Sequence, residues 1–335
     1  MKDAIERIWY RAEPPPAWLR PLGALYGAVG AELARRRQAA AVRLPVPVIV
    51  VGNLTVGGTG KTPFVLWLVQ LLRAQGWRPG VISRGYGGHA PSYPLRVGAA
   101  TDAAWAGDEP ALIARRLGVP VAVAPDRVAA ARLLLDGGEA DILISDDGLQ
   151  HYRLARDLEI CVVDGSRGLG NGALLPAGPL REPPQRLDRV QLLVVNGGGW
   201  RRDGVPALDM RLELSEAVAL EAGERRPLAA FAGQRVHAVA GIGNPQRFFD
   251  ALRGAGIEVV PHPFPDHHRY VAADLDFEPA LPLLMTEKDA VKCRELARPG
   301  WWQVPAETVI TAEGAALVQQ LVARLSPPES SKTHG

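Results

Sequence analysis

The sequence has little cysteine, little net charge and no apolar run long enough to cross a bilayer. Its two cysteines, Cys161 and Cys293, lie far apart and in no CxxC spacing, so we predict neither a disulfide framework nor a zinc site. The formal net charge of +2 is too small to indicate a nucleic-acid-binding protein. No segment has the order of charged, apolar and small residues that marks a signal peptide. These absences favour a reducing, cytoplasmic location, and nothing in the sequence indicates a protein partner.

The composition is that of an ordinary globular protein, with 47% hydrophobic and 22% charged residues, and a length of 335 residues predicts two domains. From residue 46 onward, short apolar runs alternate with helical patterns, which is typical of βαβ units and a parallel sheet. Around residues 196–206 the composition shifts to Gly, Arg and Trp, and a second α/β pattern follows. We therefore predict an α/β fold with a larger, mostly parallel domain at 45–200, a smaller α/β domain at 201–326 with connector strands at 207–214 and 303–310, and a disordered tail at 327–335.

Residues 1–44 contain an amphipathic segment followed by a cluster of arginines. Apolar residues recur at helical spacing between Trp18 and Leu33, and three arginines follow at 35–37. This pattern is expected of a helix that lies on a membrane surface beside anionic headgroups. An amphipathic helix packed on its own domain, with a solvated basic end, is an equally good interpretation.

A glycine-rich turn links the first predicted strand, Val46 to Val51, to a helix that begins near Lys61. The turn resembles the GGxGK[ST] form of a phosphate-binding loop, whereas the stricter pattern would have glycine in place of Thr55. In such a loop, backbone N–H groups hold a polyphosphate, the lysine meets its β- and γ-phosphates, and the hydroxyl of Thr62 ligates Mg²⁺. A chance glycine-rich turn is the alternative. The pattern predicts a P-loop NTPase-like kinase domain that binds ATP through Thr55, Gly57, Gly58, Thr59, Gly60, Lys61 and Thr62.

Two aspartates follow another predicted strand, Asp141 to Ser145. Asp146 and Asp147 stand at the carboxyl end of a neighbouring parallel strand, where a P-loop protein holds Mg²⁺. Aspartates at strand ends are also common turn formers, so the pair alone leaves both interpretations open. Beside the lysine loop, the pair favours a Mg²⁺ site that includes Thr62.

Asp108 and a group of histidines are the candidates for acid–base chemistry. Asp108 precedes a predicted helix, where it could be an N-cap or a general base that accepts the proton of an attacking hydroxyl. His262, His267 and His268 lie close together but lack a matched metal-ligand spacing such as HExxH. A polar loop between domains, in which Asp108 or Asp266 orients a histidine, is a competing arrangement.

Other polar residues are candidates for contact with a substrate or the active site. Within the Gly- and Pro-rich loop at 165–184, Arg181 and Glu182 could be fixed near a ligand or form an exposed ion pair. Thr286 is expected to cap the helix that carries Lys288, for which an anion-facing role is a further option. The full set of such candidates is Arg84, Gln150, His151, Arg181, Glu182 and Lys288.

Seven of these motifs occur in one chain and in a fixed order: GGTGKTP at 57–63, SRGYG at 83–87, GDEP at 107–110, DDGLQH at 146–151, LPAGPLRE at 175–182, FPDHH at 264–268 and TEKDA at 286–290. Together they resemble the tetraacyldisaccharide 4′-kinase family, the lipid A 4′-kinases. The resemblance runs from near residue 45 to near residue 292.

The resemblance implies transfer of the γ-phosphate of ATP to the 4′-hydroxyl of a tetraacylated glucosamine disaccharide 1-phosphate, in lipid A biosynthesis. It places the enzyme at the cytoplasmic face of the inner membrane, as a peripheral protein held by its N-terminal helix. It also implies a cleft between two α/β domains, because the lipid acceptor and the nucleotide must meet there.

The same resemblance assigns roles to individual residues. Lys61 and Thr62 would belong to the nucleotide loop, and the aspartates at 146–147 to the Mg²⁺ region. Asp108 and His267 would form a catalytic dyad, in which the histidine tunes or orients the aspartate; His267 matches the family motif better than its neighbour. A nucleotide-switched assembly or targeting ATPase and a module that only binds sugar or nucleotide are the competing classes, and each would show no transfer to a lipid.

Overall fold

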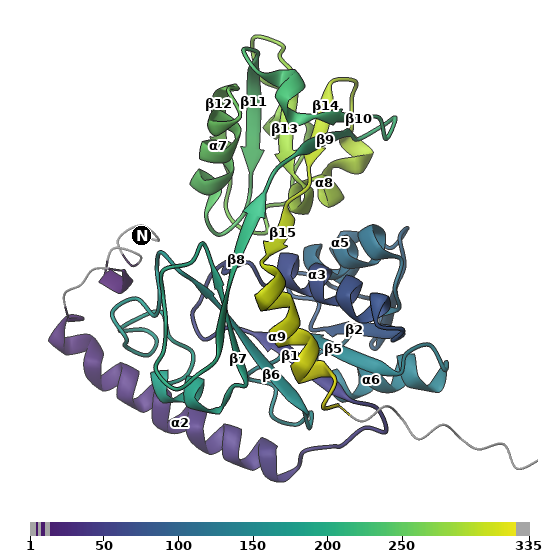
Figure 1. Ribbon diagram of the computed structural model, residues 1–335. Coiled ribbons are helices and arrows are strands. Elements are labelled where there is room, and N and C mark those ends of the chain that lie inside the picture. Colours follow the sequence, from purple (N-terminus) through teal and green to yellow (C-terminus); the bar gives the residue numbers. More distant parts are fainter. Residues whose placement is uncertain (1–4, 6–7, 11–13, 326–335) are drawn as a thin grey trace, which may run out of the picture.

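The computed structural model describes residues 5, 8–10 and 14–325, which form two lobes connected by strands (Figure 1). The tail predicted at 327–335 lies outside the described residues. The larger lobe contains a nine-stranded sheet in the order β15-β8-β7-β6-β1-β5-β2-β4-β3. Its strands are β1 Val48–Gly52, β2 Pro79–Ser83, β3 Leu95–Val97, β4 Val121–Val123, β5 Ile142–Asp146, β6 Leu158–Asp164, β7 Leu192–Asn196, β8 Ala207–Glu213 and β15 Glu307–Ile310.

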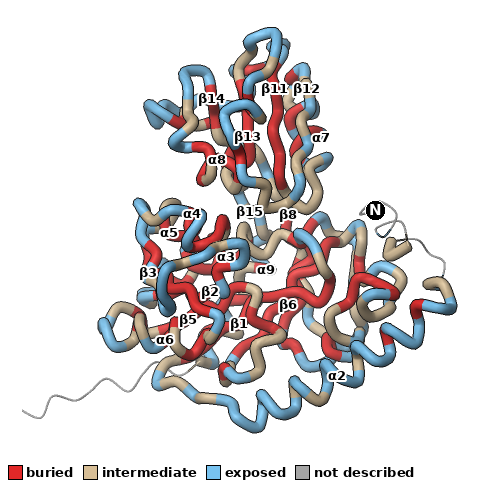
Figure 2. Tube along the Cα trace, turned by 180° about the vertical axis from the view of Figure 1, so that it is seen from behind, coloured by how far each residue is buried: buried red, intermediate tan, exposed pale blue. Residues whose placement is uncertain are grey.

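All strand pairs from β8 to β4 are parallel, and only the outer strands β3 and β15 pair antiparallel. The predicted mostly parallel α/β fold is therefore confirmed. Strands such as β1, which reads Val-Ile-Val-Val-Gly, are buried on both faces because helices and loops cover the sheet on each side (Figure 2). The lobe's helices are α3 Lys61–Ala74, α4 Ala103–Ala106, α5 Asp108–Leu117, α6 Arg127–Asp136 and α9 Ala312–Val322, with the 3₁₀ turn η2 Pro184–Arg189.

The smaller lobe is a six-stranded sheet in the order β10-β9-β14-β13-β11-β12. Its two main helices contribute to two separate apolar clusters, which indicates that they cover opposite faces of the sheet. The elements are β9 Glu216–Ala219, β10 Arg225–Pro227, η3 Leu228–Phe231, β11 Arg235–Ala240, α7 Pro245–Gly254, β12 Glu258–Pro263, η4 Ala272–Leu275, β13 Leu283–Thr286, α8 Glu287–Cys293, η5 Arg294–Leu296 and β14 Trp301–Val304.

Two strands cross between the lobes, and their arrangement differs from the predicted segment at 201–326. The run expected at 303–310 is two strands, β14 in the small sheet and β15 in the large one, because Pro305 and Ala306 separate them. Strand β15 pairs with β8, and helix α9 then buries Val318 and Val322 in the core of the larger lobe. The chain thus leaves the larger lobe at β8 and returns to it at β15.

Helix α2, Arg20–Ala39, follows the short turn η1, Ala17–Leu19, and runs along the outside of the larger lobe (Figure 1). It contacts the lobe at Gly23 and Gly27: a Cβ on Gly27 would lie 2.6 Å from Leu174 Cδ1, and one on Gly23 would lie 3.2 Å from the carbonyl oxygen of Leu174. Apolar side chains of η1 and α2 face outward: Trp18 of η1 and Leu22, Leu25, Val29 and Leu33 of α2 are all exposed, with Trp18 at 70% and Leu25 at 63%. Among the described residues, none of the helices combines the length and the apolar character that a membrane span requires.

Candidate active site

The phosphate loop lies between β1 and α3, where β1 is flanked by β5 on one side and β6 on the other. This is the point at which the strand order reverses, the usual position of a ligand in an open parallel sheet. Gly60 has a φ of 94°, and a Cβ there would lie 2.5 Å from the side-chain nitrogen of Asn196. Asn196 Nδ2 donates to the carbonyl of Thr59 at 3.1 Å, so the close approach that glycine permits fixes the loop against the end of β7.

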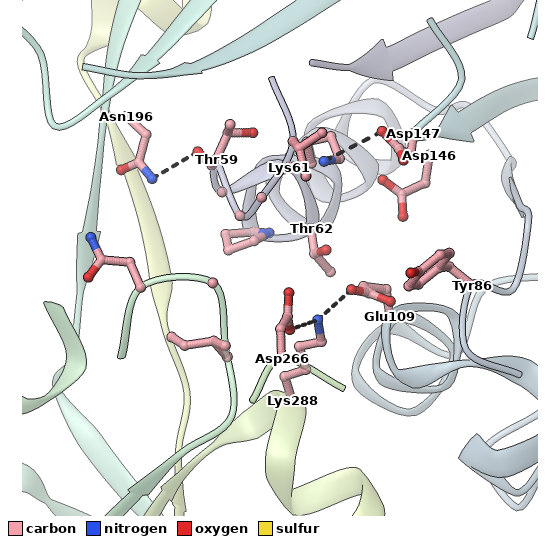
Figure 3. Close-up of a pocket in the computed structure, with 18 of the residues that line it drawn as sticks. Thr59, Lys61, Thr62, Tyr86, Glu109, Asp146, Asp147, Asn196, Asp266 and Lys288 are labelled. Carbon is pink, nitrogen blue, oxygen red and sulfur yellow. Dashed lines mark hydrogen bonds and ion pairs between the residues drawn. The ribbon is translucent and has the colours of Figure 1, made fainter. Parts of the chain in front are cut away.

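Lys61 is the first residue of α3, and its ammonium group turns back over the loop (Figure 3). Nζ donates to Asn53 Oδ1 at 3.1 Å and lies 3.5 Å from Asp147 Oδ1. Asn53 in turn donates to the carbonyl of Thr55, so the residue that replaces the glycine of the stricter motif supports the loop through its backbone. Thr55 itself is buried, and its backbone forms an isolated antiparallel β-bridge with Leu180.

Asp146 ends β5 and Asp147 follows it beside the loop, and the pKa values of their carboxyl groups shift in opposite directions. Burial raises the pKa of Asp146 to about 7, with only partial compensation from Lys61. Burial acts in the same direction on Asp147, but the charges of Lys61 and Arg181 outweigh it and lower its pKa to about 2. Arg181 Nη1 donates to both oxygens of Asp147, at 3.2 and 3.1 Å, whereas Asp146 Oδ1 is buried and has no hydrogen-bond partner within the described part of the chain.

Asp108 and His267 meet across the two lobes. His267 Nδ1 lies 3.0 Å from Asp108 Oδ2, although 159 residues separate them. Asp108 is the first residue of α5, and the N-cap is Gly107 with a φ of 89°, so the interpretation of Asp108 as an N-cap is wrong. The next histidine, His268, instead contacts Asp274 at 3.0 Å. The structure therefore selects His267 as the partner of Asp108.

The charges around this pair come from both lobes. Burial would raise the pKa of Asp108, but the hydrogen bond with His267 and the nearby lysines of α8 lower it. The same hydrogen bond raises the pKa of His267. Lys288, also on α8, lies between Glu109 Oε1 at 2.6 Å and Asp266 Oδ1 at 3.0 Å, and Figure 3 shows it facing the phosphate loop across the cleft. Thr286 caps this helix, as predicted, by accepting from the N–H of Asp289.

Most of the remaining candidates line the cavity, and Glu182 instead contacts residues near it. Arg84, Gln150, His151 and Arg181 line the cavity, and Arg84 makes no ion pair with another described residue. Glu182 does not line it: this carboxylate accepts from Gln150 Nε2 at 2.9 Å and also from Tyr152, so it positions neighbours of the site. His151 Nε2 accepts from the N–H of Arg127 at 3.4 Å, and burial together with the charge of Arg127 lowers the pKa of His151 to about 4.

Sequence reasoning missed four residues that the structure brings to the site. Asn53 and Asn196 hold the phosphate loop, and Glu109 pairs with Lys288. Arg127 is buried at the start of α6 and lines the cavity, and its Nε has no hydrogen-bond partner among the residues that the structure describes. Asn196 could have been found, because it directly follows the predicted strand at 190–195, at the carboxyl edge of the parallel sheet where the loop also lies.

One cavity of about 1590 Å³ joins these groups. The phosphate loop, Asp146 and Asp147 line it from the larger lobe, and His267 and Lys288 line it from the smaller one. A lysine loop at the switch point of a parallel sheet, with carboxylates at the next strand end, defines a P-loop phosphotransferase. A family model described as tetraacyldisaccharide-1-P 4′-kinase matches residues 16–326. The chain belongs to this family and is an ATP-dependent lipid A 4′-kinase.

Individual relatives agree with the family model. The chain is 55% identical over 312 residues to the tetraacyldisaccharide 4′-kinase of Pseudomonas aeruginosa (strain UCBPP-PA14), which covers 92% of this chain and 93% of the relative. It is 50% identical over 334 residues to the enzyme of the same name from Pseudomonas putida (strain W619), with 98% of each chain covered. A crystal structure of LpxK from Aquifex aeolicus in complex with ATP superposes with a TM-score of 0.77 at 31% identity, over 91% of this chain and 98% of that one.

Proposed function

We propose that the cleft transfers the γ-phosphate of ATP to the 4′-hydroxyl of the lipid, with the nucleotide on the loop at 57–62 and Asp108 as the base. The observation that best supports this is the Asp108–His267 contact: His267 lines the same cavity as Lys61 from the smaller lobe, and Asp108 lies directly behind His267. Phosphoryl transfer needs positioning and neutralised charge more than covalent chemistry, and the cavity supplies both.

In this proposal the acceptor oxygen forms a bond to the γ-phosphorus while the bond to the β-phosphate oxygen breaks. The proton of the attacking hydroxyl passes to Asp108. Because His267 contacts Oδ2, Asp108 Oδ1 is left for that hydroxyl. The lowered pKa of Asp108 keeps it ionised, and a weak base suffices because the transition state is loose and the proton leaves late. Lys61 neutralises the phosphate charge, and Lys288 faces it from the small lobe.

Mg²⁺ is the cofactor that fits the carboxylates beside the loop, with Thr62, Asp146 and Asp147 as the proposed ligands. A buried carboxylate oxygen without a hydrogen-bond partner, as on Asp146, suits a cation bound in addition to the protein's own donors. No cluster of three metal-ligating side chains occurs among the described residues, and Mg²⁺ at a nucleotide needs only one or two carboxylates besides phosphate and water. When bound, Mg²⁺ would neutralise charge on the β- and γ-phosphates.

The lipid would enter from the side of α2. The cavity extends from the phosphate loop to Tyr26 and Arg37 of that helix, and the exposed apolar stripe of α2 supports docking on a membrane. The arginines at 35–37 would then face anionic headgroups, which fits a peripheral enzyme at the cytoplasmic face of the inner membrane. Arg84, Gln150, His151 and Arg181, which line the same cavity, would contact the polar part of the acceptor.

The test is a transfer assay with γ-labelled ATP, Mg²⁺ and the tetraacyldisaccharide 1-phosphate in detergent. We expect the wild-type protein to label the lipid and Lys61→Ala to reduce the rate by at least about a thousandfold, because the γ-phosphate loses its charge partner. Arg73→Ala removes an exposed cation from the same helix, away from the loop, and should leave the rate unchanged. Labelled inorganic phosphate without labelled lipid would contradict the proposal.

A further inference from the structure

Lysine is rare in this chain and is concentrated at the cleft. Five of its 38 basic side chains are lysines, and those among the described residues are Lys61, Lys288 and Lys292. The first two line the cavity, and Lys292 lies behind its wall, next to Asp108. Lysine presents a compact charge on a flexible stem, whereas arginine presents a planar fork that needs more space. In a chain that uses arginine almost everywhere else, lysine at these positions indicates that a compact ammonium is required.

Lys292 carries a buried charge between two carboxylates of different lobes. Its Nζ lies 3.5 Å from Asp108 Oδ2 and 3.0 Å from Asp289 Oδ1, and 5.1 Å from the ring of Tyr270. The side chain is 8% exposed, and Nζ has no hydrogen-bond partner among the described residues. Burying an ammonium is costly, so the ion pairs of a buried lysine are weak evidence for a role in stability.

Asp289 fixes the place of this ammonium from within the small lobe. Its carboxylate is completely buried and accepts from Thr286 Oγ1 at 2.6 Å, from the N–H of Gly241 at 2.9 Å and from the Tyr270 hydroxyl at 3.0 Å. These three donors hold Asp289 in one position at the start of α8. Lys292, one turn later on the same helix, is thereby directed at Asp108.

We propose that Lys292 is a positioning residue for the lipid kinase reaction, which keeps Asp108 ionised in its buried site and leaves Oδ1 for the acceptor hydroxyl. The inference rests on the proposed role of Asp108 as the base. Both Lys292 and His267 approach the same oxygen, Oδ2, and no hydrogen bond to Oδ1 is present among the described residues.

The charge balance around Asp108 gives Lys292 this effect. Burial favours the neutral carboxyl, and His267, Lys292 and Lys288 oppose it, in that order of strength. The titratable and charged groups that face Asp108 are Glu109 on α5, Lys288, Asp289, Lys292 and Cys293 on α8, and Asp266, His267 and Tyr270 on the segment before η4. Removing Lys292 leaves His267 as the main group that opposes protonation of Asp108.

A purely structural role for Lys292, as a clamp between α5 and α8, is less well supported. Arg115 Nη1 already donates to the carbonyl of Val291 at 3.0 Å, and Arg116 pairs with Glu287 at 2.7 Å. These contacts hold the two helices together over the turn that carries Lys292. We therefore expect the lobes to remain docked when the ion pair at Asp108 is removed.

The test is the pH dependence of kcat/KM for lipid phosphorylation. In Lys292→Met, protonation of Asp108 occurs at higher pH, so the acid limb moves upward: we expect kcat/KM about tenfold below wild type on the acid side and within about threefold on the plateau. Lys292→Gln, a polar neutral variant, should show the same movement. A loss that is uniform across pH would overturn the inference, because a structural role predicts just that.

Two controls separate this inference from the proposed function. Arg298→Met removes an exposed cation of the small lobe that pairs with Asp276, and the limb should not move. In the Asp108→Asn background, Lys292→Met should cause no further movement of the limb. If Asp108→Asn retained wild-type activity, the proposed function would fail together with the inference. If Asp108→Asn were inactive while Lys292→Met kept the wild-type limb, only the inference would fail.

Discussion

The two lobes contribute to one site in different ways. The larger lobe provides its groups at the carboxyl ends of parallel strands: the loop with Lys61 follows β1, and Asp146 ends β5 with Asp147 directly after it. The smaller lobe provides His267 from a loop, and Lys288 and Lys292 from helix α8, which reach the cleft because α8 contacts α5. Groups at strand ends are fixed by the sheet, whereas groups from the smaller lobe depend on how the lobes dock.

The lobes also differ in how each changes the pKa of a histidine at the site. His151, in the larger lobe, has a lowered pKa because it is buried near Arg127. His267, in the smaller lobe, has a raised pKa because Asp108 accepts from it across the cleft. The larger lobe therefore presents a neutral imidazole at neutral pH, and the smaller lobe an imidazole that is protonated more readily. Three further predictions test this difference between the lobes.

The largest effect should come from breaking the contact between lobes at Asp108. Asp108→Asn removes the proposed base and should lower kcat by about a hundredfold to ten-thousandfold, and His267→Asn by a smaller factor, about tenfold to a hundredfold. Steady-state phosphorylation of the lipid measures both. His268→Asn is the matched control, because His268 contacts Asp274 on its own lobe, and it should stay within about threefold of wild type. Equal losses in the two histidine variants would show that the dyad is misassigned.

The second prediction concerns the pH dependence of stability. The unfolded chain binds a proton at His151 near pH 6.5, whereas the folded chain does so near pH 4. The wild-type protein therefore loses stability as the pH falls through this window. Between pH 7 and 4.5, the free energy of unfolding of His151→Gln should fall by about 2 kcal/mol less than that of wild type. Urea unfolding at both pH values gives the difference.

His267 should have the opposite sign in the same measurement. Its raised pKa contributes stability that is present at low pH and lost as the pH rises through the folded value. His267→Gln should therefore lose more stability at pH 4.5 than at pH 7. If the difference in unfolding free energy between variant and wild type changed with pH in the same direction for both variants, the histidines of the two lobes would not have opposite pKa shifts.

The smallest effect should be on membrane binding, and only substitutions in the larger lobe should cause it. Leu25→Glu with Val29→Glu places two charges on the exposed stripe of α2, and binding to vesicles that contain anionic lipid should weaken by about tenfold. The unfolding midpoint should not change, because both side chains are exposed. Val271→Glu charges an exposed apolar position on the smaller lobe and should leave sedimentation with vesicles unaltered. Equal loss in both variants would indicate a general charge effect.

Several elements were predictable because their signals are local. The strand and helix around the loop at 57–62 are adjacent in sequence, so the glycine pattern and the flanking apolar runs predicted the element order and the position of the loop between them. Thr286 as a helix cap was predictable for the same reason. The split of the run at 303–310 between two sheets was not, since both halves have the periodicity of a strand and only the packing assigns them to different lobes.

By itself, the sequence determined the parallel sheet, the phosphate loop and the aspartates beside it, because each depends on backbone geometry within a few residues. The family resemblance pointed to His267 as the partner of Asp108, but only the tertiary structure showed that these two side chains meet while His268 contacts Asp274, and that Lys292 lies behind the pair. It also decided that the apolar stripe of α2 is exposed. These features depend on how residues far apart in the chain pack together, and a pattern of residue types carries no information on that docking.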